Sequence, residues 1–384
     1  MSEQMTFVNQ YTGHLFIDIV NAFADKDIPC TLITGKIDPN FTPLNPKVTL
    51  YLHKPYNKKS LLKRFLSWIS FTLFAFKKLL FLNKRATLFF VTNPAMVCFL
   101  GLFFKAIFKQ PYVVLIYDLY PDAMVNFGYV KNKSFIHKTW SFLNKPLFEK
   151  AKAVFTISTG MAQRIQHYAP QINPVIIPNW TDIHQVKPLK KSENPFAIKH
   201  QQTDKLTILY AGNMGLTHDL ESVLYAAKTL SPYPHIQFIL IGEGSKKPWI
   251  EHFIKKEDLH NVTLMPLQPA HIIPLSIPCG DIAIVTLGEG GEYVSVPSKV
   301  YYYMAAGCCI LSIAGIHSEL ESLTQTFHLG KRVNPKNESE IVDFVLEMST
   351  NPDTLKKFKE NARAASLNFT KENAQKFYTT LFDS

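Results

Sequence analysis

The sequence predicts an α/β protein made of two doubly wound, Rossmann-like domains that face a central cleft. Three observations support this expectation. The chain has 384 residues, which is long for a single core. Short apolar runs alternate with helix-like segments in both halves of the chain. A polar stretch without apolar periodicity separates the halves. Ligands should then bind at the carboxyl ends of the strands.

The first half contains runs rich in β-branched and aromatic residues, as buried parallel strands should. We expect strands at residues 6–10, 30–34, 48–53, 86–92, 112–118, 153–158 and 175–180. Helical patterns occupy residues 14–24 and 58–82. Together these elements predict an N-terminal domain over residues 1–183.

The second half repeats the alternation. We expect strands at residues 206–212, 236–242, 262–267, 281–287 and 308–314, and helices at residues 220–229, 298–306 and from 338 onward. The polar stretch of residues 184–204 is then a linker, and residues 205–368 form the C-terminal domain.

Charge is distributed unevenly. Between residues 39 and 117 there are twelve Lys and Arg but no Asp or Glu, although the net charge of the whole chain is only +11. An anionic partner is therefore expected for this region. No helix-turn-helix, zinc-finger or RNA-binding signature is visible, so nucleic acid is not the expected partner.

The five cysteines lack metal-binding spacing, which indicates buried thiols in a reducing compartment. The start of the chain does not resemble a signal peptide. We therefore expect a cytoplasmic protein, peripheral on the inner face of the plasma membrane.

Residues 59–85 form a basic, aromatic-rich amphipathic helix on a helical-wheel projection. Its Lys63, Trp68, Lys77 and Lys78 are candidates for contact with the membrane or a membrane-bound acceptor. The alternative is a domain helix with a solvated basic face. The uncharged stretch 86–104 is interrupted by Asn93 and Pro94, which favours a strand, a turn and a buried helix over a membrane span.

The clearest candidate site follows the strand at 206–212. The loop there contains Gly212, Asn213, Met214 and Gly215, and a helix opens near Asp219. Glycines let backbone N–H groups approach a phosphate, and a helix N-terminus favours its negative charge. An ordinary strand-to-helix turn is the alternative.

A second candidate site begins at Pro297 and Ser298, which are typical helix-start residues. Lys299 then falls in the first helical turn, where a cation opposes the helix dipole, and a bound diphosphate would explain it. A solvated surface lysine is the alternative. The preceding glycine-rich loop carries Glu289 and Glu292, which can hydrogen-bond sugar or ribose hydroxyls.

Other strand ends carry polar residues or glycines. Asp118 ends a very apolar strand and Asp122 follows it, so either can bind hydroxyls, act as a base or cap the next helix. Glu243 lies in a glycine loop after residues 236–242, and Gly13 and His14 follow the first strand. Asp25 and Asp27 spell a DxD, but they lie between a helix and a strand, which indicates a solvated turn.

The ordered set IYDLYPD, VFTISTGMAQRI, VIIPNW, YAGNMGLTHDLE, LIGEGSKK and VPSKVYYYMAAG resembles glycosyltransferase family 4 over nearly the whole chain. The resemblance is strongest to the branch that builds bacterial O-antigen, capsule or colanic acid. It implies the GT-B fold, a nucleotide-sugar donor, retention of anomeric configuration and no need for a metal.

The resemblance also assigns roles to residues. It places Gly212 to Gly215, Ser298 and Lys299 at the donor diphosphate, with Gly13 approaching from the other domain. Pro266 and Leu267 should lie near the base. The last helix, about residues 369–384, should return to the N-terminal domain.

The chain departs from the family pattern at three positions. Many members carry two glutamates eight positions apart, where this chain has Val294 and Tyr302. Glu289 or Glu292 can substitute for them. A histidine that is common after the equivalent N-domain strand is Tyr117 here.

The expected function is transfer of a sugar, of the N-acetylated hexosamine type, from a UDP-sugar to a lipid-linked saccharide. Lys299 would offset charge on the departing diphosphate, and Asp118 would orient the acceptor. One alternative is a catalytically impaired nucleotide-sugar-binding partner or scaffold at the membrane. Another is a nucleotide-sugar epimerase of the same fold.

Overall fold

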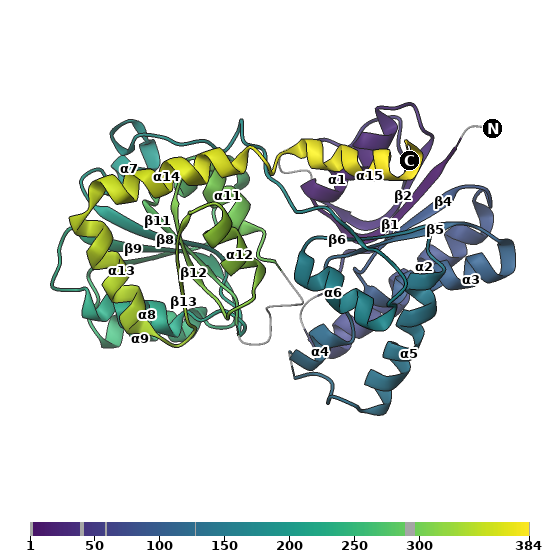
Figure 1. The fold of residues 1–384 in the computed structure, drawn as a ribbon, viewed down its shortest axis with the longest axis horizontal. Coiled ribbons are helices and arrows are strands. Elements are labelled where there is room, and N and C mark those ends of the chain that lie inside the picture. Colours follow the sequence, from purple (N-terminus) through teal and green to yellow (C-terminus); the bar gives the residue numbers. More distant parts are fainter. Residues whose placement is uncertain (1–2, 39–41, 58–59, 127, 289–295, 384) are drawn as a thin grey trace. The chain divides into compact units, whose positions relative to one another are not determined.

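The computed structural model describes residues 3–38, 42–57, 60–126, 128–288 and 296–383. It forms two compact units. Unit 1 comprises Met1–Asn179 and Lys371–Ser384, and unit 2 comprises Trp180–Thr370. Each unit is built around one parallel β-sheet (Figure 1).

The sheet of unit 1 has the strand order β3-β2-β1-β4-β5-β6-β7, and all its pairs are parallel. The strand order reverses between β1 and β4, because the chain first adds strands on one side of β1 and then on the other. The strands are β1 (Met5–Thr12), β2 (Cys30–Ile37), β3 (Thr49–Leu52), β4 (Thr87–Val91), β5 (Tyr112–Ile116), β6 (Ala153–Thr156) and β7 (Val175–Ile176).

Helices cover both faces of this sheet (Figure 1). Helices α1 (His14–Ala24) and α15 (Gln375–Phe382) lie on one face; α2 (Leu61–Phe81), α3 (Phe99–Phe108) and α5 (Phe135–Glu149) lie on the other. The remaining helices are η1 (Ala95–Cys98), α4 (Asp122–Asn126), α6 (Thr159–Tyr168) and η5 (Lys371–Ala374).

The C-terminal helix α15 belongs to the core of unit 1. The ring of Phe377 lies 6.0 Å from that of Phe89 in β4 and 4.8 Å from that of Phe155 in β6. Aromatic packing of this kind anchors a chain end that would otherwise fray. The end of the chain thus returns to the unit that contains its beginning.

The sheet of unit 2 has the order β10-β9-β8-β11-β12-β13, again with all pairs parallel. Here the order reverses between β8 and β11. The strands are β8 (Leu206–Asn213), β9 (Ile236–Glu243), β10 (Val262–Met265), β11 (Ile282–Thr286), β12 (Cys309–Ile313) and β13 (Gly330–Val333).

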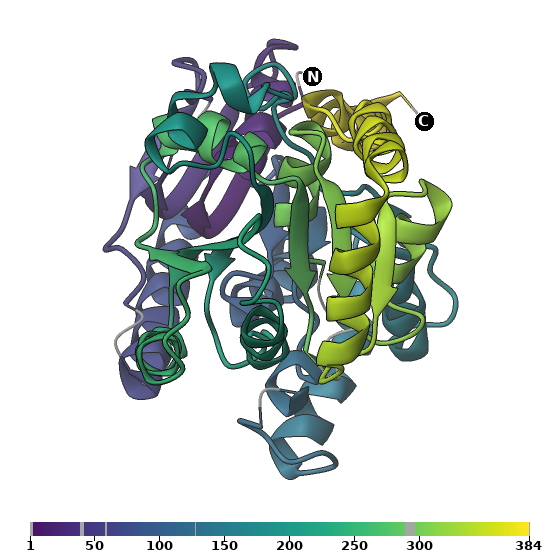
Figure 2. The same cartoon turned by 90° about the vertical axis from the view of Figure 1, so that its left-hand side faces the viewer.

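Figure 2, which faces unit 2, shows the long C-terminal helices beside its strands. The helices are η2 (Lys191–Glu193), α7 (Pro195–Lys199), α8 (Glu221–Thr229), α9 (Lys247–Lys256), η3 (Ala270–Ile272), α10 (Ile273–Ser276), η4 (Ile277–Cys279), α11 (Lys299–Ala305), α12 (Glu319–Thr326), α13 (Glu338–Thr350) and α14 (Pro352–Ser366).

The polar stretch 184–204 differs from the predicted linker, because it folds as part of unit 2. Lys191 donates to the carboxylate of Asp281 and, at 2.8 Å, to Thr207 Oγ1. Asn194 caps α7 and donates to the carbonyl of Leu275 at 2.8 Å. Contacts with partners this distant in sequence produce no periodic pattern, so the polar composition wrongly indicated a linker.

The apolar stretch 86–104 forms β4, η1 and the beginning of α3, as predicted. Among the described residues, no helix combines the length and apolar character that crossing a bilayer requires.

Candidate functional site

The two strongest sequence candidates meet at the strand reversal of unit 2. The loop Gly212 to Gly215 starts in the last residues of β8, and Lys299 begins α11, which follows β11. Because β8 and β11 are neighbours whose following helices diverge, their carboxyl ends form the usual ligand position of a doubly wound sheet.

The glycine loop is held rigidly against the end of β9. The N–H of Met214 donates to the carbonyl of Glu243 at 2.8 Å, and the N–H of Lys246 donates to the carbonyl of Met214 at 2.9 Å. A Cβ atom on Gly242 would lie 1.9 Å from the carbonyl oxygen of Gly212, so the backbones touch there. The Met214 side chain is buried in the core and both of its backbone polar groups are engaged, so Met214 shapes the loop and does not itself face a ligand.

Lys299 is half-buried as a residue, and its Nζ atom is enclosed against this loop. Its Nζ has no hydrogen-bond partner among the described residues and lies 3.8 Å from the centre of the Tyr210 ring. A Cβ atom on Gly212 would lie 2.9 Å from Nζ, so glycine makes the close approach possible. Burial lowers the pKa of Lys299 from 10.5 to about 7. The alternative of a solvated surface lysine is therefore wrong.

A buried amine without a partner is costly, and in the first turn of a helix it also opposes the helix dipole. A ligand anion removes both penalties, because it pairs with the ammonium and brings negative charge to the positive end of the helix dipole. The neighbouring Ser298 is exposed and makes no side-chain cap to α11, so its hydroxyl is available to such an anion. Pro297 precedes it and is half-buried.

His218 is a site residue that the sequence analysis missed. Its Nδ1 lies 3.1 Å from the carbonyl oxygen of Thr286, at the end of β11, so Nδ1 carries the proton. Burial, followed by the charge of Lys299, lowers the pKa of His218 to about 4. The imidazole is thus neutral near pH 7. Its place three residues after Gly215, directly before Asp219, was the only sequence signal.

The other predicted donor-binding residues occupy the same sheet edge with less definite geometry. Asn213 lies beside Gly215, where a Cβ atom would be 2.7 Å from its Nδ2. Glu243 is exposed and pairs with Lys247 at 2.7 Å. Tyr302 is half-buried one turn after Lys299.

Pro266 and Leu267 are both exposed directly after β10. Glu289, Glu292 and Val294 lie outside the described residues. The geometry therefore supports Lys299 and the glycine loop most directly.

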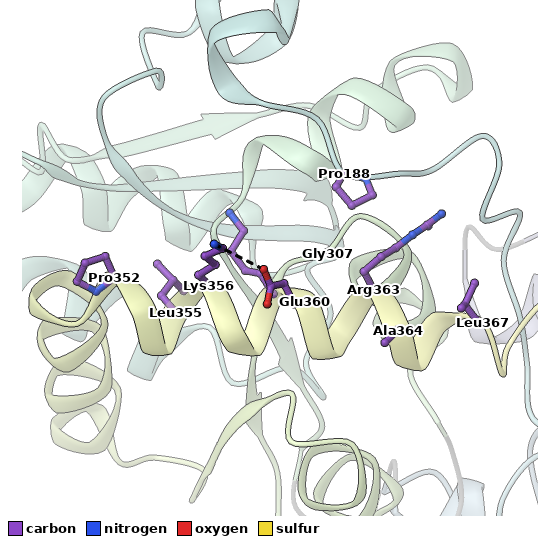
Figure 3. A pocket seen from close by; sticks show the side chains of 10 residues that line it. Pro188, Gly307, Pro352, Leu355, Lys356, Glu360, Arg363, Ala364 and Leu367 are labelled. Carbon is purple, nitrogen blue, oxygen red and sulfur yellow. Dashed lines mark ion pairs between the residues drawn. The ribbon is translucent and has the colours of Figure 1, made fainter.

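A groove of about 550 Å³ lies elsewhere in unit 2, along α14 (Figure 3). Its charged residues already have partners. Lys359 pairs with Asp281 at 2.8 Å, Lys356 with Glu360 at 3.9 Å, and Arg363 donates to the carbonyls of Ile183, Val186 and Ala305. These satisfied charges indicate a structural region and not the ligand site.

Unit 1 has its own polar sheet edge. Gly13 is the N-cap of α1 and His14 its first residue. Gly13 has ordinary extended backbone, and a Cβ atom there would meet nothing closer than 3.6 Å. The fold therefore does not require glycine at this position.

Asp118 lies just beyond β5 on the same edge. The hydroxyl oxygen of Thr92 accepts from the N–H groups of Tyr117 at 3.1 Å and Asp118 at 3.3 Å, which fixes the backbone there. Burial raises the pKa of Asp118 from 3.8 to about 6. A carboxyl with this pKa suits acid–base or hydroxyl-binding chemistry near neutral pH.

Asp122 differs from Asp118 because its carboxylate is already engaged. One oxygen accepts from Arg164 Nε at 2.6 Å and the other from the Tyr168 hydroxyl at 2.5 Å. Asp122 is buried and lies in the first turn of α4. These contacts tie α4 to α6 and favour a structural role for Asp122 over the predicted acceptor binding.

The helical-wheel projection predicted that α2 has separate basic and apolar faces. The structure differs from this prediction. Phe71, Ala75 and Leu79 pack inward, yet six large apolar side chains point outward: Leu62, Phe65, Leu66, Leu73, Leu80 and Phe81. Lys63 and Lys77 are exposed among them.

Trp68 and Lys78 of α2 depart from the predicted membrane-facing position. Trp68 is half-buried and stacks at 6.4 Å on Tyr56, and Lys78 lies 4.5 Å from the centre of the Tyr51 ring. Contacts with Tyr56 and Tyr51, and not helical periodicity alone, therefore decide how far these two side chains face outward.

The DxD of Asp25 and Asp27 lies between α1 and β2, at the amino end of the strand. Asp27 pairs with Lys47 at 2.6 Å and both side chains are exposed. The predicted solvated turn is confirmed.

Comparison with known proteins places this geometry in a family context. Residues 191–365 match the family model "Glycosyl transferases group 1". The chain is 30% identical over 178 residues to "Putative colanic acid biosynthesis glycosyl transferase WcaI" of Escherichia coli (strain K12), covering 45% of this chain and 43% of that protein.

A second relative is "Probable glycosyltransferase WbjE" of Pseudomonas aeruginosa, with 24% identity over 261 residues, 67% of this chain and 65% of that one. The matched segments thus span 43% and 65% of these two curated relatives.

Solved structures match along the whole chain. Anabaena Alr3699/HepE in complex with UDP and glucose superposes with a TM-score of 0.75 at 12% identity, covering 99% of both chains. WaaG, a glycosyltransferase involved in lipopolysaccharide biosynthesis, gives 0.72 at 12% identity, covering 99% of this chain and all of that one. The chain therefore has the GT-B fold, residues 191–365 of its unit 2 match the group 1 glycosyl transferase model, and the proteins it resembles include a putative colanic acid biosynthesis glycosyl transferase.

Proposed function

We propose that the protein is a retaining, metal-independent glycosyltransferase of the family 4 type. It transfers a sugar from a UDP-sugar to a lipid-linked saccharide during synthesis of a bacterial surface polysaccharide such as capsule or O-antigen. The donor sugar is of the N-acetylated hexosamine type. The observation that carries this proposal is the buried, unpartnered ammonium of Lys299 beside the glycine loop.

The donor diphosphate fits this site chemically. It brings negative charge to an amine that burial leaves without a partner, next to backbone N–H groups at the start of a helix. A solved relative of the same fold is described in complex with UDP and glucose, which supports a UDP-sugar as the donor class.

The proposed reaction depends mainly on stabilising the leaving group. As the bond between the sugar and the diphosphate breaks, negative charge grows on the diphosphate, and Lys299 with the loop N–H groups offsets it. The acceptor hydroxyl attacks from the face that the diphosphate leaves and passes its proton to an oxygen of the departing diphosphate, so the anomeric configuration is retained. Asp118 holds the acceptor hydroxyl, since its pKa of about 6 keeps most of the carboxyl ionised near pH 7.

The outward-facing side chains of unit 1 support the proposed acceptor and the proposed location of the protein. The exposed apolar side chains and lysines of α2 favour a protein that is peripheral on the anionic cytoplasmic face of the inner membrane. Lipid-linked saccharides are anionic and membrane-bound, so this surface brings the enzyme to such an acceptor. The colanic acid relative supports a polysaccharide pathway.

A transfer assay tests the proposal. The purified protein is incubated with radiolabelled UDP-N-acetylhexosamines and lipid-linked saccharides in detergent, and organic-phase product and its anomeric configuration are measured. We expect product with retained configuration, and about a 10²-fold loss of turnover in Lys299→Ala. Lys356→Ala, an exposed lysine on α14, is the matched control and should keep full turnover.

One observation favours a second function. Val294 and Tyr302 stand where many family members have glutamates, which points to a nucleotide-sugar-binding scaffold at the membrane. UDP binding without turnover on any donor and acceptor pair would support the scaffold and reject the transferase.

A further inference from the structure

Helix α5 exposes an unusually apolar outer surface. Phe135 is 83% exposed and Phe142 is 76% exposed, and Ile136 between them is also exposed. The helical pattern of the sequence did not single out this helix. Both views show the start of α5 at the end of the helical layer farthest from the strands of unit 1 (Figures 1 and 2).

Helix α5 packs in the same layer as α2 and α3. The ring of Phe76 in α2 lies 5.3 Å from that of Phe103 in α3, and Phe99 of α3 lies 5.7 Å from Trp140 in α5. The three helices therefore pack into one layer. Their outward side chains include Phe81, which is 82% exposed, and Ile107.

Exposed apolar side chains are more frequent in this part of the sequence than elsewhere in the described chain. The described residues expose 23 large apolar side chains, and fifteen of these lie between residues 50 and 142. Single exposed apolar residues are normal on soluble proteins, but a concentration of this kind marks an interaction surface.

Charge identifies the partner. Between residues 39 and 148 the sequence has sixteen Lys and Arg, and its only acids are Asp118 and Asp122. Asp122 is buried and paired with Arg164. Near the start of α5, Lys131, Lys133 and Lys138 are exposed. Apolar insertion with a cationic surround complements anionic lipid headgroups above an acyl layer.

We propose that α5 is a second membrane anchor, whose Phe135, Ile136 and Phe142 insert at the headgroup boundary of an anionic bilayer. Lys131, Lys133 and Lys138 contact the lipid headgroups. The proposal deepens the membrane association of the proposed function, on which it rests. Two anchors, α2 and α5, fix the orientation of unit 1 on the membrane, whereas one helix permits rotation about its own axis.

Vesicle flotation tests the anchor with the full chain. Vesicles of phosphatidylcholine with phosphatidylglycerol should bind the wild-type protein, and vesicles of phosphatidylcholine alone should bind it much more weakly. Phe135→Ser/Phe142→Ser should lower the partition coefficient at least about tenfold, since two phenyl groups no longer insert. Ile198→Ser/Tyr233→Ser removes two exposed apolar side chains from unit 2 and should bind like wild type.

A depth measurement then distinguishes insertion from an indirect effect. Phe142→Trp should be quenched by brominated lipids in the vesicles, and Ile198→Trp should not gain quenching over wild type. Unchanged binding of the double serine variant, or an unquenched Phe142→Trp, would overturn the proposal. Concentration-dependent dimers that the double variant abolishes, with no vesicle binding, would assign the surface to a second copy instead.

Nucleotide binding separates this proposal from the proposed function. UDP should raise the melting temperature of Phe135→Ser/Phe142→Ser as much as that of wild type, because the donor site belongs to unit 2. The same result shows that the double variant is folded. Loss of vesicle binding with an intact UDP response confirms the anchor, and a failed transferase assay would leave that result unaffected.

Discussion

The Nζ atom of Lys299 lies 3.8 Å from the centre of the Tyr210 ring, with no hydrogen-bond partner among the described residues. The ring faces the amine and supplies part of the stabilisation that water would give. The site is therefore poised for an anion, since a diphosphate provides the full negative charge that the ring cannot.

Binding of UDP should take up a proton at Lys299. The pKa of the free site is about 7 because of burial, so above pH 7 most of the amine is neutral, and the diphosphate raises the pKa again. Affinity should then fall as pH rises above 7. Isothermal titration at pH 8 in buffers of different ionisation enthalpy should show uptake approaching one proton, absent in Lys299→Met.

His218 serves as an internal check on that titration. Its pKa of about 4 keeps it neutral at pH 8, so His218→Gln should leave most of the proton uptake in place. Equal heats in all buffers for wild type would contradict a neutral Lys299 in the free site.

Gly212→Ala should weaken UDP binding strongly. Gly212 has φ +143°, and a Cβ atom would lie 2.9 Å from Lys299 Nζ, so alanine strains the loop and displaces the amine that binds UDP. The same strain should lower the free energy of unfolding by about 1–3 kcal/mol, which urea denaturation measures.

Gly13→Ala is the matched control for stability, because its extended backbone accepts alanine without a clash. It should unfold like wild type. If it also lowers turnover, the predicted approach of Gly13 to the donor is supported; equal destabilisation by both alanines would contradict the strain argument.

Asp118→Asn should impair binding of the acceptor hydroxyl without affecting donor binding. Because burial raises the pKa of Asp118 to about 6, the wild-type rate should climb between pH 5 and pH 7 as the carboxylate ionises. We expect about a 10²-fold loss of turnover and loss of this acidic limb in the variant. An unchanged pH profile would show that another group controls the rate.

Asp281→Ala should destabilise unit 2. Its carboxylate pairs with Lys191 and, at 2.8 Å, with Lys359, so the variant leaves both amines without a counter-ion, although Lys191 keeps its bond to Thr207 Oγ1; we expect a cost of about 1–3 kcal/mol. Burial opposes ionisation of Asp281, but the two lysines outweigh it and lower its pKa.

The stabilisation that Asp281 provides is therefore complete above the ordinary carboxyl range and is lost as pH falls through the lowered pKa. Denaturant titrations at pH 7 and at acidic pH measure it, with the exposed Asp258→Ala as control. Equal stability of both variants at pH 7 would refute the role of the cluster.

Local patterns predicted the strands, the glycine loop and the position of Lys299 in a first helical turn. These patterns did not predict the burial and partners of side chains that are set by contacts with residues distant in sequence. The sequence places Lys191 in a polar linker, because its partner Asp281 is ninety residues away and can be identified only from the structure. Trp68 reads as membrane-facing until its stacking on Tyr56 is seen, and the burial of Lys299 depends on Tyr210 and Gly212 together.

The most direct test of the central claim is thermal unfolding of the wild-type protein and Lys299→Met with UDP, GDP, CMP and ADP. Of these four nucleotides, we expect only UDP to raise the wild-type melting temperature. A ligand at about 100 times its dissociation constant adds about 2.7 kcal/mol to the free energy of unfolding. Lys299→Met should melt no lower than wild type without ligand and should not respond to UDP. An equal UDP shift in both proteins, or no shift with any nucleotide, would contradict a donor site built around Lys299.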